Sequence, residues 1–354
     1  MINNIEQILR LRNYNNTYIK FILIMSISLY SFTILGHHSV AEYDRSVVRE
    51  LEGEILTLHW RNPHVRFSLR IENSDGVEEI WDLEAQSVNG QDRRGVPRDL
   101  MKVGDKILAA GHPSTRQKNH MFMTNILLST GLEIITQEAG DARWSENTIG
   151  STLVEQRNDA TKEAQGIFRV WMRRMPPGLF PRNLPLTEAA NEARASWDPI
   201  IDDGIMRCVA PGMPFAMLGR GPHPIDFTEQ NGDIVIRAEY FDIVRVVHMG
   251  ETGNVAEQPL SELGYSVGHW ENDDLVVRTS RIDWPLFDRT GVPQSQSSEI
   301  LERFSLSNEE GTELAYTITV NDPETFTEPV TAIWTWQWHP ELEIEPYECT
   351  IEAD

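Results

Sequence analysis

The sequence predicts a mostly β protein with two domains, a small OB-like barrel or sandwich and a larger antiparallel barrel of the lipocalin type. Three observations support this fold class. Short apolar–polar alternations recur along the chain, strong hairpin signals separate them, and only a few segments favour helices. Short strands joined by turns are typical of barrels and sandwiches. The chain of 354 residues is long enough for two such domains.

Residues 1–36 are predicted to be an export signal that is not part of the fold. A basic lead, Met1–Lys20, precedes the apolar run Phe21–Leu35, and the small residue Gly36 follows. This order is typical of a secretory signal. The run is shorter than the roughly 20 apolar residues of a membrane span, and an uncleaved anchor stays open as the alternative. We therefore expect a periplasmic or secreted protein without a membrane span after signal removal.

Net charge and cysteine content limit the expected partners and the expected compartment of the protein. The chain carries 31 basic and 54 acidic residues, which gives a net charge of −23. Such a surface repels nucleic acid and anionic lipid, so neither is an expected partner. The two cysteines are Cys208 and Cys349. In an exported chain such a pair favours a disulfide, and two free thiols are the alternative.

The small barrel is predicted over residues 37–132. His64–Ile71 alternates cleanly between apolar and polar residues, which is typical of a strand with one buried face. A helical turn is possible near Pro97–Met101. The other expected elements are a strand region over 46–60, a turn at Asn73–Gly76, and strands at Glu79–Leu83, Ile107–Ala110 and Met121–Leu128.

Residues 133–165 are polar and acidic, so we interpret them as a linker with one possible helix near Leu153–Glu163. The larger barrel is predicted over 166–354, and a capped, Ala-rich helix is expected near its start at Leu186–Ala195. Antiparallel strands dominate after Cys208. The expected pairs are Ile225–Gln230 with Asp233–Tyr240 around the turn Asn231-Gly232, Tyr265–Trp270 with Asp274–Ser280, and Glu299–Leu306 with Glu313–Val320, followed by Val330–Trp338.

A family resemblance adds to this interpretation. The motif residues that carry it are His37-His38-Ser39, Trp60-Arg61-Asn62-Pro63-His64, Arg93-Arg94-Gly95, Arg98-Asp99-Leu100 and Gly104-Asp105. With these motifs, residues 37–132 resemble the bacterial family of exported proteins called domain of unknown function 6152. Val96 departs from the pattern, because an aromatic residue is common there. The resemblance implies export and β structure, and it implies no reaction.

The second domain resembles another uncharacterised exported bacterial module. The matching pieces are Arg207-Cys208, Gly212-Met213-Pro214, Ser266–Glu271, Leu275-Val276-Val277, Glu302-Arg303-Phe304, Asp322-Pro323 and Glu348-Cys349. This likeness also implies secretion and β structure.

The histidine pair His37-His38 is the first candidate site. If the signal is cleaved after Gly36, His37 gains a free α-amine. An amine and imidazoles together can supply nitrogen ligands that lie in one plane around a metal ion, and this arrangement favours Cu(II). We therefore predict a metal site, with copper favoured, at His37, His38 and His64. The alternatives are an ordinary start of the mature chain and, for His64, a rigid strand entry after the turn.

Arg93, Arg94 and Arg98 form a basic cluster that suits a carboxylate or phosphate. Ion pairs with the neighbouring aspartates are the favoured interpretation.

Two further sets of residues are candidates in the larger barrel. His269, Glu271 and Glu302 lie on or beside hairpins and include the groups needed for acid–base catalysis. Trp334, Trp336 and Trp338 alternate on one strand face, and with Trp270 they either fill the barrel or line a cavity for a small apolar ligand.

Three functions stay open on this basis. The first is a binding protein for a small apolar molecule, with a metal or partner on the small barrel. The second is an enzyme that uses the His/Glu set, and the third is an interaction module of the cell envelope. The sequence contains no phosphate-loop, CxxC, HExxH or Gly-x-Ser-x-Gly motif, which argues against the commonest nucleotide, zinc-protease and α/β-hydrolase chemistries.

Overall fold

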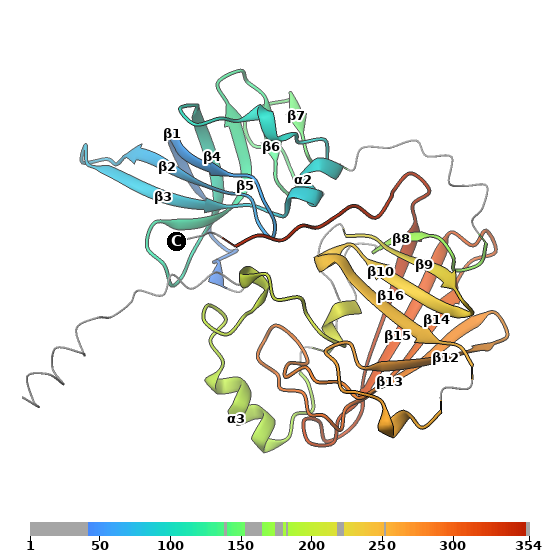
Figure 1. The fold of residues 1–354 in the computed structure, drawn as a ribbon. Coiled ribbons are helices and arrows are strands. Elements are labelled where there is room, and N and C mark those ends of the chain that lie inside the picture. Colours follow the sequence, from blue (N-terminus) through green and yellow to red (C-terminus); the bar gives the residue numbers. More distant parts are fainter. Residues whose placement is uncertain are drawn as a thin grey trace, which may run out of the picture. The chain divides into compact units, whose positions relative to one another are not determined.

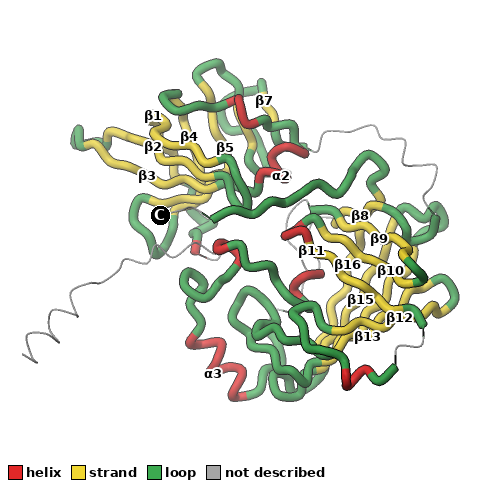
Figure 2. Tube along the Cα trace, in the orientation of Figure 1, coloured by secondary structure: helices red, strands yellow, loops and turns green. Residues whose placement is uncertain are grey.

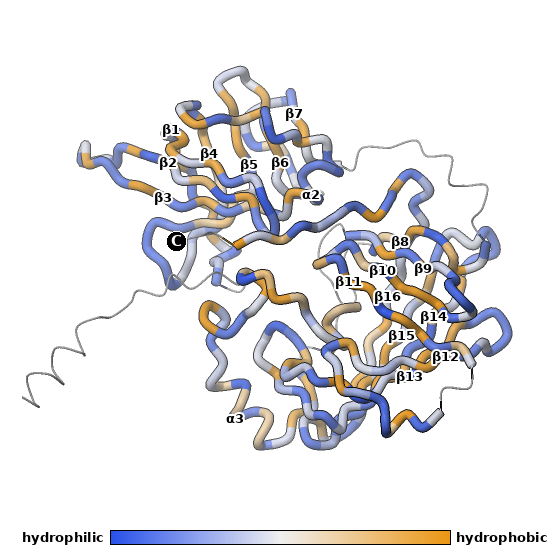
Figure 3. Tube along the Cα trace, in the orientation of Figure 1, coloured by the Kyte–Doolittle hydropathy of each residue, from blue (hydrophilic) through white to orange (hydrophobic). Residues whose placement is uncertain are grey.

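The chain forms two closed barrels in the computed structural model (Figure 1), which confirms the fold class. The sequence did not predict two strands of the larger barrel, Val170–Arg173 and Ile243–His248. The structure describes residues 42–137, 140–152, 165–173, 180–181, 183–217, 223–250 and 253–351. Some predictions fall outside these residues. They are the export segment, the histidines His37 and His38, and the helix expected near Leu153–Glu163. Helices are few and short (Figure 2), and the apolar residues follow the strands of both barrels (Figure 3).

The small barrel has the strand order of an OB fold. Its strands are β1 (Arg49–His59), β2 (Arg66–Glu72), β3 (Glu78–Glu84), β4 (Lys106–Pro113) and β5 (His120–Leu128). The antiparallel order β3-β2-β1-β4-β5 closes through the parallel pair β3–β5. Helix α2 (Val88–Arg93) lies between β3 and β4 in sequence, and the Ser87 side chain caps it by accepting from the backbone N–H of Gly90. The OB-like prediction is therefore confirmed.

Two short strands extend this sheet into the segment interpreted as a linker. They are β6 (Glu133–Ile135) and β7 (Thr148–Ile149), and both belong to the sheet of the small barrel. The carboxylate of Glu133 is buried and accepts the backbone N–H groups of Arg143, Trp144 and Ser145. These hydrogen bonds satisfy a buried acid. From the sequence alone, an acidic residue is expected at the surface, so the hydropathy pattern does not indicate a strand here.

The larger barrel is an up-and-down meander of nine strands, β8 to β16, in which each strand pairs with the next and β16 closes onto β8. The strands are β8 (Val170–Arg173), β9 (Ile225–Gln230), β10 (Asp233–Ala238), β11 (Ile243–His248), β12 (Tyr265–Glu271), β13 (Asp274–Ser280), β14 (Glu299–Leu306), β15 (Glu313–Asn321) and β16 (Val330–Trp338). Helix α3 (Glu188–Ser196), capped by Thr187, precedes β9, as predicted.

One pair in this barrel differs from the rest. β11 and β12 run parallel and pair only through Val247↔Ser266 and His248↔Val267, whereas the other eight pairs are antiparallel. The hairpin turns follow the sequence signals. Asn231 and Gly232 have φ angles of 56° and 88° between β9 and β10, a conformation that asparagine and glycine tolerate best.

The predicted disulfide between Cys208 and Cys349 is present, with the two Cα atoms 5.6 Å apart. It fixes a C-terminal strap, which we define as residues 339–351. The strap also contacts the Asn-Pro-His turn. The side-chain amide of Asn62 donates to the carbonyl of Tyr347, and the backbone N–H of Thr350 donates to the carbonyl of Asn62 at 3.2 Å.

Two arginines of the cluster have partners that lie far from them in sequence. Arg93 is buried and binds both carboxylate oxygens of Glu239, a residue of the larger barrel. Arg94 donates to Gln86 Oε1 at 2.7 Å and to the carbonyl of Thr136 at 3.1 Å. The favoured interpretation therefore missed the long-range acid, because sequence adjacency says nothing about residues that the fold brings in.

Candidate functional site

The aromatic face of β16 lies in the packed interior of the larger barrel. Trp334 and Trp336 are buried, and both contact Tyr316, with ring centroids at 4.6 Å and 4.9 Å. Trp338 is half-buried, and the Arg169 guanidinium lies 4.3 Å from its ring centroid. These contacts fill the space around β16.

A buried ion pair occupies another part of the interior. Arg245 donates to both carboxylate oxygens of Glu302, and its remaining N–H groups donate to Ser266 Oγ at 3.0 Å and Thr279 Oγ1 at 2.7 Å. The hydroxyl of Tyr316 donates to Glu302 Oε1 at 2.7 Å. Burial by itself lowers the pKa of Arg245, but the Glu302 carboxylate raises it above the ordinary arginine value. Each of these groups is satisfied by a neighbour, as a structural network requires.

The three acid–base candidates are not brought together. His269 and Glu271 lie on the outer face of β12, with their side chains 62% and 46% exposed, and they contact each other at 3.1 Å. Glu302 points into the barrel and is fully buried. General acid–base catalysis needs both groups within reach of one substrate, and this arrangement does not supply that.

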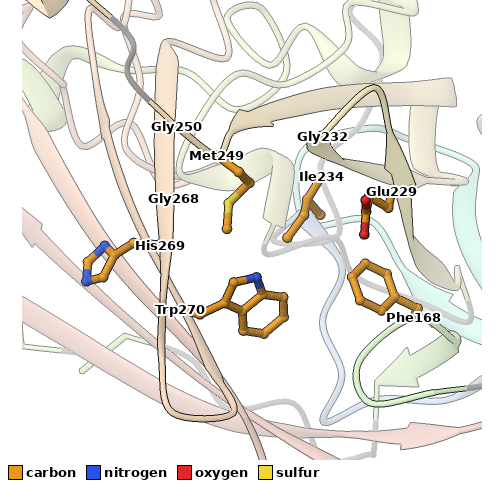
Figure 4. Close-up of a pocket in the computed structure, with 9 residues that line it drawn as sticks. All are labelled: Phe168, Glu229, Gly232, Ile234, Met249, Gly250, Gly268, His269 and Trp270. Atoms are coloured by element: carbon orange, nitrogen blue, oxygen red, sulfur yellow. The ribbon is translucent and has the colours of Figure 1, made fainter.

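Trp270 lies at a pocket beside the β9–β10 hairpin (Figure 4). It has the same strand parity as the inward-facing Ser266 and Gly268, but it stands near the end of β12 and is 43% exposed. Figure 4 shows Trp270, Met249, Ile234 and Phe168 around one space, while the imidazole of His269 lies on the other side of β12. The pocket encloses about 680 Å³.

Local backbone features form this pocket. The hairpin of β9 and β10 contributes Glu229, Gly232 and Ile234. Beyond His248, β11 leaves the sheet, and Met249 packs over Gly268, where an added Cβ would stand 2.6 Å from the Met249 sulfur. A glycine at position 268 is therefore needed for this close approach.

A second depression adjoins the pocket and shares Phe168 and Trp270 with it. The two rings lie 6.2 Å apart at an interplanar angle of 60°. The second depression adds the acidic residues Asp273 and Asp274. An aromatic pair thus stands between two acidic depressions.

In the small barrel, His64 belongs to a buried polar cluster. Its Nδ1 lies 2.7 Å from Glu84 Oε1, and His120 Nε2 lies 3.9 Å from Glu84 Oε2. A hydrogen bond of 2.6 Å joins the Tyr43 hydroxyl to His120 Nε2. Burial raises the pKa of the Glu84 carboxyl, but the neighbouring His64 and Arg66 outweigh burial and hold this pKa far below its usual range.

The metal prediction is only partly covered by the structure. His37 and His38 lie outside the described residues. Within the described ranges, no group of three His, Cys, Asp or Glu side chains is arranged to hold a metal ion.

Several site residues were not found from the sequence. Phe168, Met249 and Glu229 join Trp270 in the pocket, and Arg245 is the partner of Glu302. The Asn231-Gly232 signal places Glu229 near a hairpin end, but nothing in the sequence places that end beside Trp270. The other residues carry no local signal.

Comparison with known proteins identifies one family. Residues 24–122 match the family described as "Family of unknown function (DUF6152)", which confirms the resemblance of the N-terminal domain. No curated protein matches the chain. Across the part of the chain that the structure describes, no helix has the length and apolar character needed to cross a membrane.

Proposed function

We propose that this chain is an exported binding protein that holds a small apolar molecule in the pocket at Trp270 of its larger barrel. The observation that carries the proposal is the position of Trp270. This large aromatic side chain is 43% exposed at a pocket that also contains Phe168 and Met249. Exposing such a side chain to water is unfavourable, and a ligand that covers it gains apolar burial.

The size and lining of the pocket fit a small ligand. Its volume of about 680 Å³ lies within the range of roughly 300–1,000 Å³ that is usual for small-molecule sites. Its side chains are Phe168, Ile234, Met249 and Trp270, with the Glu229 carboxylate as a polar group. Polar groups beside apolar side chains orient a ligand and set its specificity.

Export is supported by the covalent chemistry of the chain. The Cys208–Cys349 disulfide joins residues 141 positions apart, and such bonds persist in oxidising compartments. An exported binding protein meets its ligand in the periplasm or outside the cell.

Replacement of Trp270 tests this function. We expect Trp270→Ala to weaken ligand binding at least about tenfold, because loss of a buried aromatic contact is worth about 1–3 kcal/mol. Native mass spectrometry of the protein purified from its own host should show a bound molecule, which the variant loses. Trp144→Ala is the matched control, since Trp144 lies in the small barrel beside Arg143. Protein without a bound molecule, together with unchanged binding of an apolar fluorescent dye in Trp270→Ala, would overturn the proposal.

We also propose a copper site at the mature N-terminus, with His37, His38 and His64 as ligands. The observation that favours it is the buried Glu84 carboxylate, which lies 2.7 Å from His64 Nδ1 and supplies negative charge beside an imidazole. The contacts of Tyr43 place it in the same cluster, and His38 precedes it by five residues. At roughly 3.3–3.6 Å per residue, His38 stays within about 18 Å of Tyr43.

Electron paramagnetic resonance of the Cu(II)-loaded mature protein tests this second proposal. We expect a tetragonal, nitrogen-rich spectrum that changes in His37→Ala and in His64→Ala, because each substitution removes a donor. His269→Ala, which removes an exposed histidine of the larger barrel, is the control and should leave the spectrum unchanged. A spectrum that is the same in His37→Ala and in the unmodified protein would end the idea.

A further inference from the structure

We infer that the molecule held at Trp270 carries an alkylated ammonium group, which binds against the rings of Trp270 and Phe168. This inference rests on the proposed binding function and adds a charge requirement to it. Three separate observations support it. Two concern the pocket, namely the charges around the rings and the arrangement of the rings. The third concerns the surroundings of the other tryptophan side chains in this chain.

The charged residues around the two rings are predominantly acidic. Glu229 lines the pocket, and Asp273 and Asp274 line the adjoining depression. No lysine or arginine occurs among the described residues that line either one. Arg303 pairs with Asp274 at 2.8 Å, and Arg169 lies with Glu229 and Phe168 in a third depression. Neither arginine lines the two depressions at Trp270, so acids outnumber bases there. A neutral apolar ligand has no use for these carboxylates, whereas a cation is attracted to them.

The arrangement of the rings suits a cation. The Phe168 and Trp270 rings are tilted at 60° with centroids 6.2 Å apart, so a group seated in the angle that they form can contact both rings at once. In Figure 4 the carboxylate of Glu229 lies next to the Phe168 ring. Aromatic rings with a nearby carboxylate are the usual means of recognising quaternary ammonium groups, whose positive charge is spread over alkyl surface.

Most of the other described tryptophan rings in this chain contact an arginine. The rings of Trp81, Trp144, Trp334 and Trp338 each have an arginine guanidinium within about 6 Å. No described arginine or lysine stands over Trp270 in the same way. Trp270 is also the most exposed of these side chains, so its face is left for a cation from outside. The net charge of −23 raises the local concentration of such cations.

A pair of isosteric probes tests the charge requirement directly. Choline and 3,3-dimethylbutan-1-ol have nearly the same shape, but only choline is charged. Titration monitored by tryptophan fluorescence or calorimetry should show choline binding about tenfold more tightly than the alcohol. Raising the salt concentration should weaken choline binding and leave alcohol binding unchanged.

Variants separate the contributions of charge and ring. Glu229→Gln should weaken choline binding about threefold without changing alcohol binding. Its control is Glu328→Gln, an exposed acid of the β15–β16 connection. Trp270→Phe should keep most of the preference for choline, and Trp270→Leu should abolish it while keeping an apolar surface. Thermal unfolding of each variant establishes that it is folded.

The outcomes distinguish this inference from the proposed function. If the alcohol binds as tightly as choline, or if choline binding does not depend on Trp270, the inference is overturned and the apolar-binding function stands. If neither probe binds, the inference is also overturned. The function is then judged separately, by native mass spectrometry of the protein from its host.

Discussion

At the scale of single residues, the buried pair of Arg245 and Glu302 shows how a charge is accommodated inside a barrel. Glu302 accepts from Arg245 and from the Tyr316 hydroxyl, and Arg245 also donates to Ser266 and Thr279. Burial raises the pKa of Tyr316 well above its usual value, and the Glu302 carboxylate adds to this effect. The tyrosine therefore stays neutral and acts as a hydrogen-bond donor. Arg245 and Glu302 are the charged members of the network.

Removing one member of this pair should be far worse than removing both. We expect Glu302→Ala to lower the free energy of unfolding by about 3–5 kcal/mol, because Arg245 would stay buried without its counter-charge. The double variant Arg245→Met with Glu302→Leu should lose much less. Urea unfolding of both variants provides the measurement. Equal losses for the single and double variants would contradict a charge-based origin.

Single residues also show why the candidate site could be predicted only in part. Alternation assigns Trp334, Trp336 and Trp270 to inward-facing positions of their strands, and the structure agrees. It does not give the height of a residue along the barrel axis, which depends on how strands from distant segments are staggered. Height decides burial here: Trp334 is 5% exposed, and Trp270 at the strand end is 43% exposed.

At the scale of elements, the C-terminal strap joins segments that are far apart in sequence. Cys349 forms a disulfide with Cys208. Asn62 forms hydrogen bonds to the strap through its side-chain amide and its backbone carbonyl. The side-chain amide of Asn89 also donates to the carbonyl of Pro346 at 3.1 Å. The turn that carries a family motif therefore also positions the end of the chain.

Loss of the disulfide should destabilise the protein without dismantling its barrels. A cross-link between residues 141 positions apart stabilises by up to about 5 kcal/mol in the chain-entropy description. We expect Cys208→Ala with Cys349→Ala to unfold at a lower urea concentration and to be cleaved earlier by proteases within 339–351. Identical urea midpoints for the variant and the unmodified protein would show that the hydrogen bonds of the strap suffice alone.

Elements were the most predictable level of this protein. The Asn231-Gly232 turn, the alternation at His64–Ile71 and the capped helix at Glu188–Ser196 are local signals, and each appears in the structure. β6 was missed because its first residue, Glu133, is a buried acid that backbone N–H groups of another segment stabilise. Local patterns cannot report hydrogen bonds that form only after the chain has folded.

At the scale of the whole molecule, sequence predicted two barrels but not the relations between distant residues. The pair of Arg93 and Glu239 is separated by 146 positions, and the ring contact of Phe168 and Trp270 by about a hundred. Both contacts join segments that are far apart along the chain, and no short window of sequence contains both partners. The parts of the candidate site that were missed are of this kind.

The single parallel pair of the larger barrel has a consequence that follows from counting. In a closed ring of strands, the direction can alternate all the way round only if the number of strands is even. With nine strands, at least one neighbouring pair must run the same way, and here that pair is β11 and β12. A parallel neighbour cannot be reached by a tight turn, so β11 leaves the sheet while β12 continues to Trp270. The odd number of strands therefore requires one break in the alternation, and in this barrel the break lies at β11 and β12, beside the pocket at Trp270.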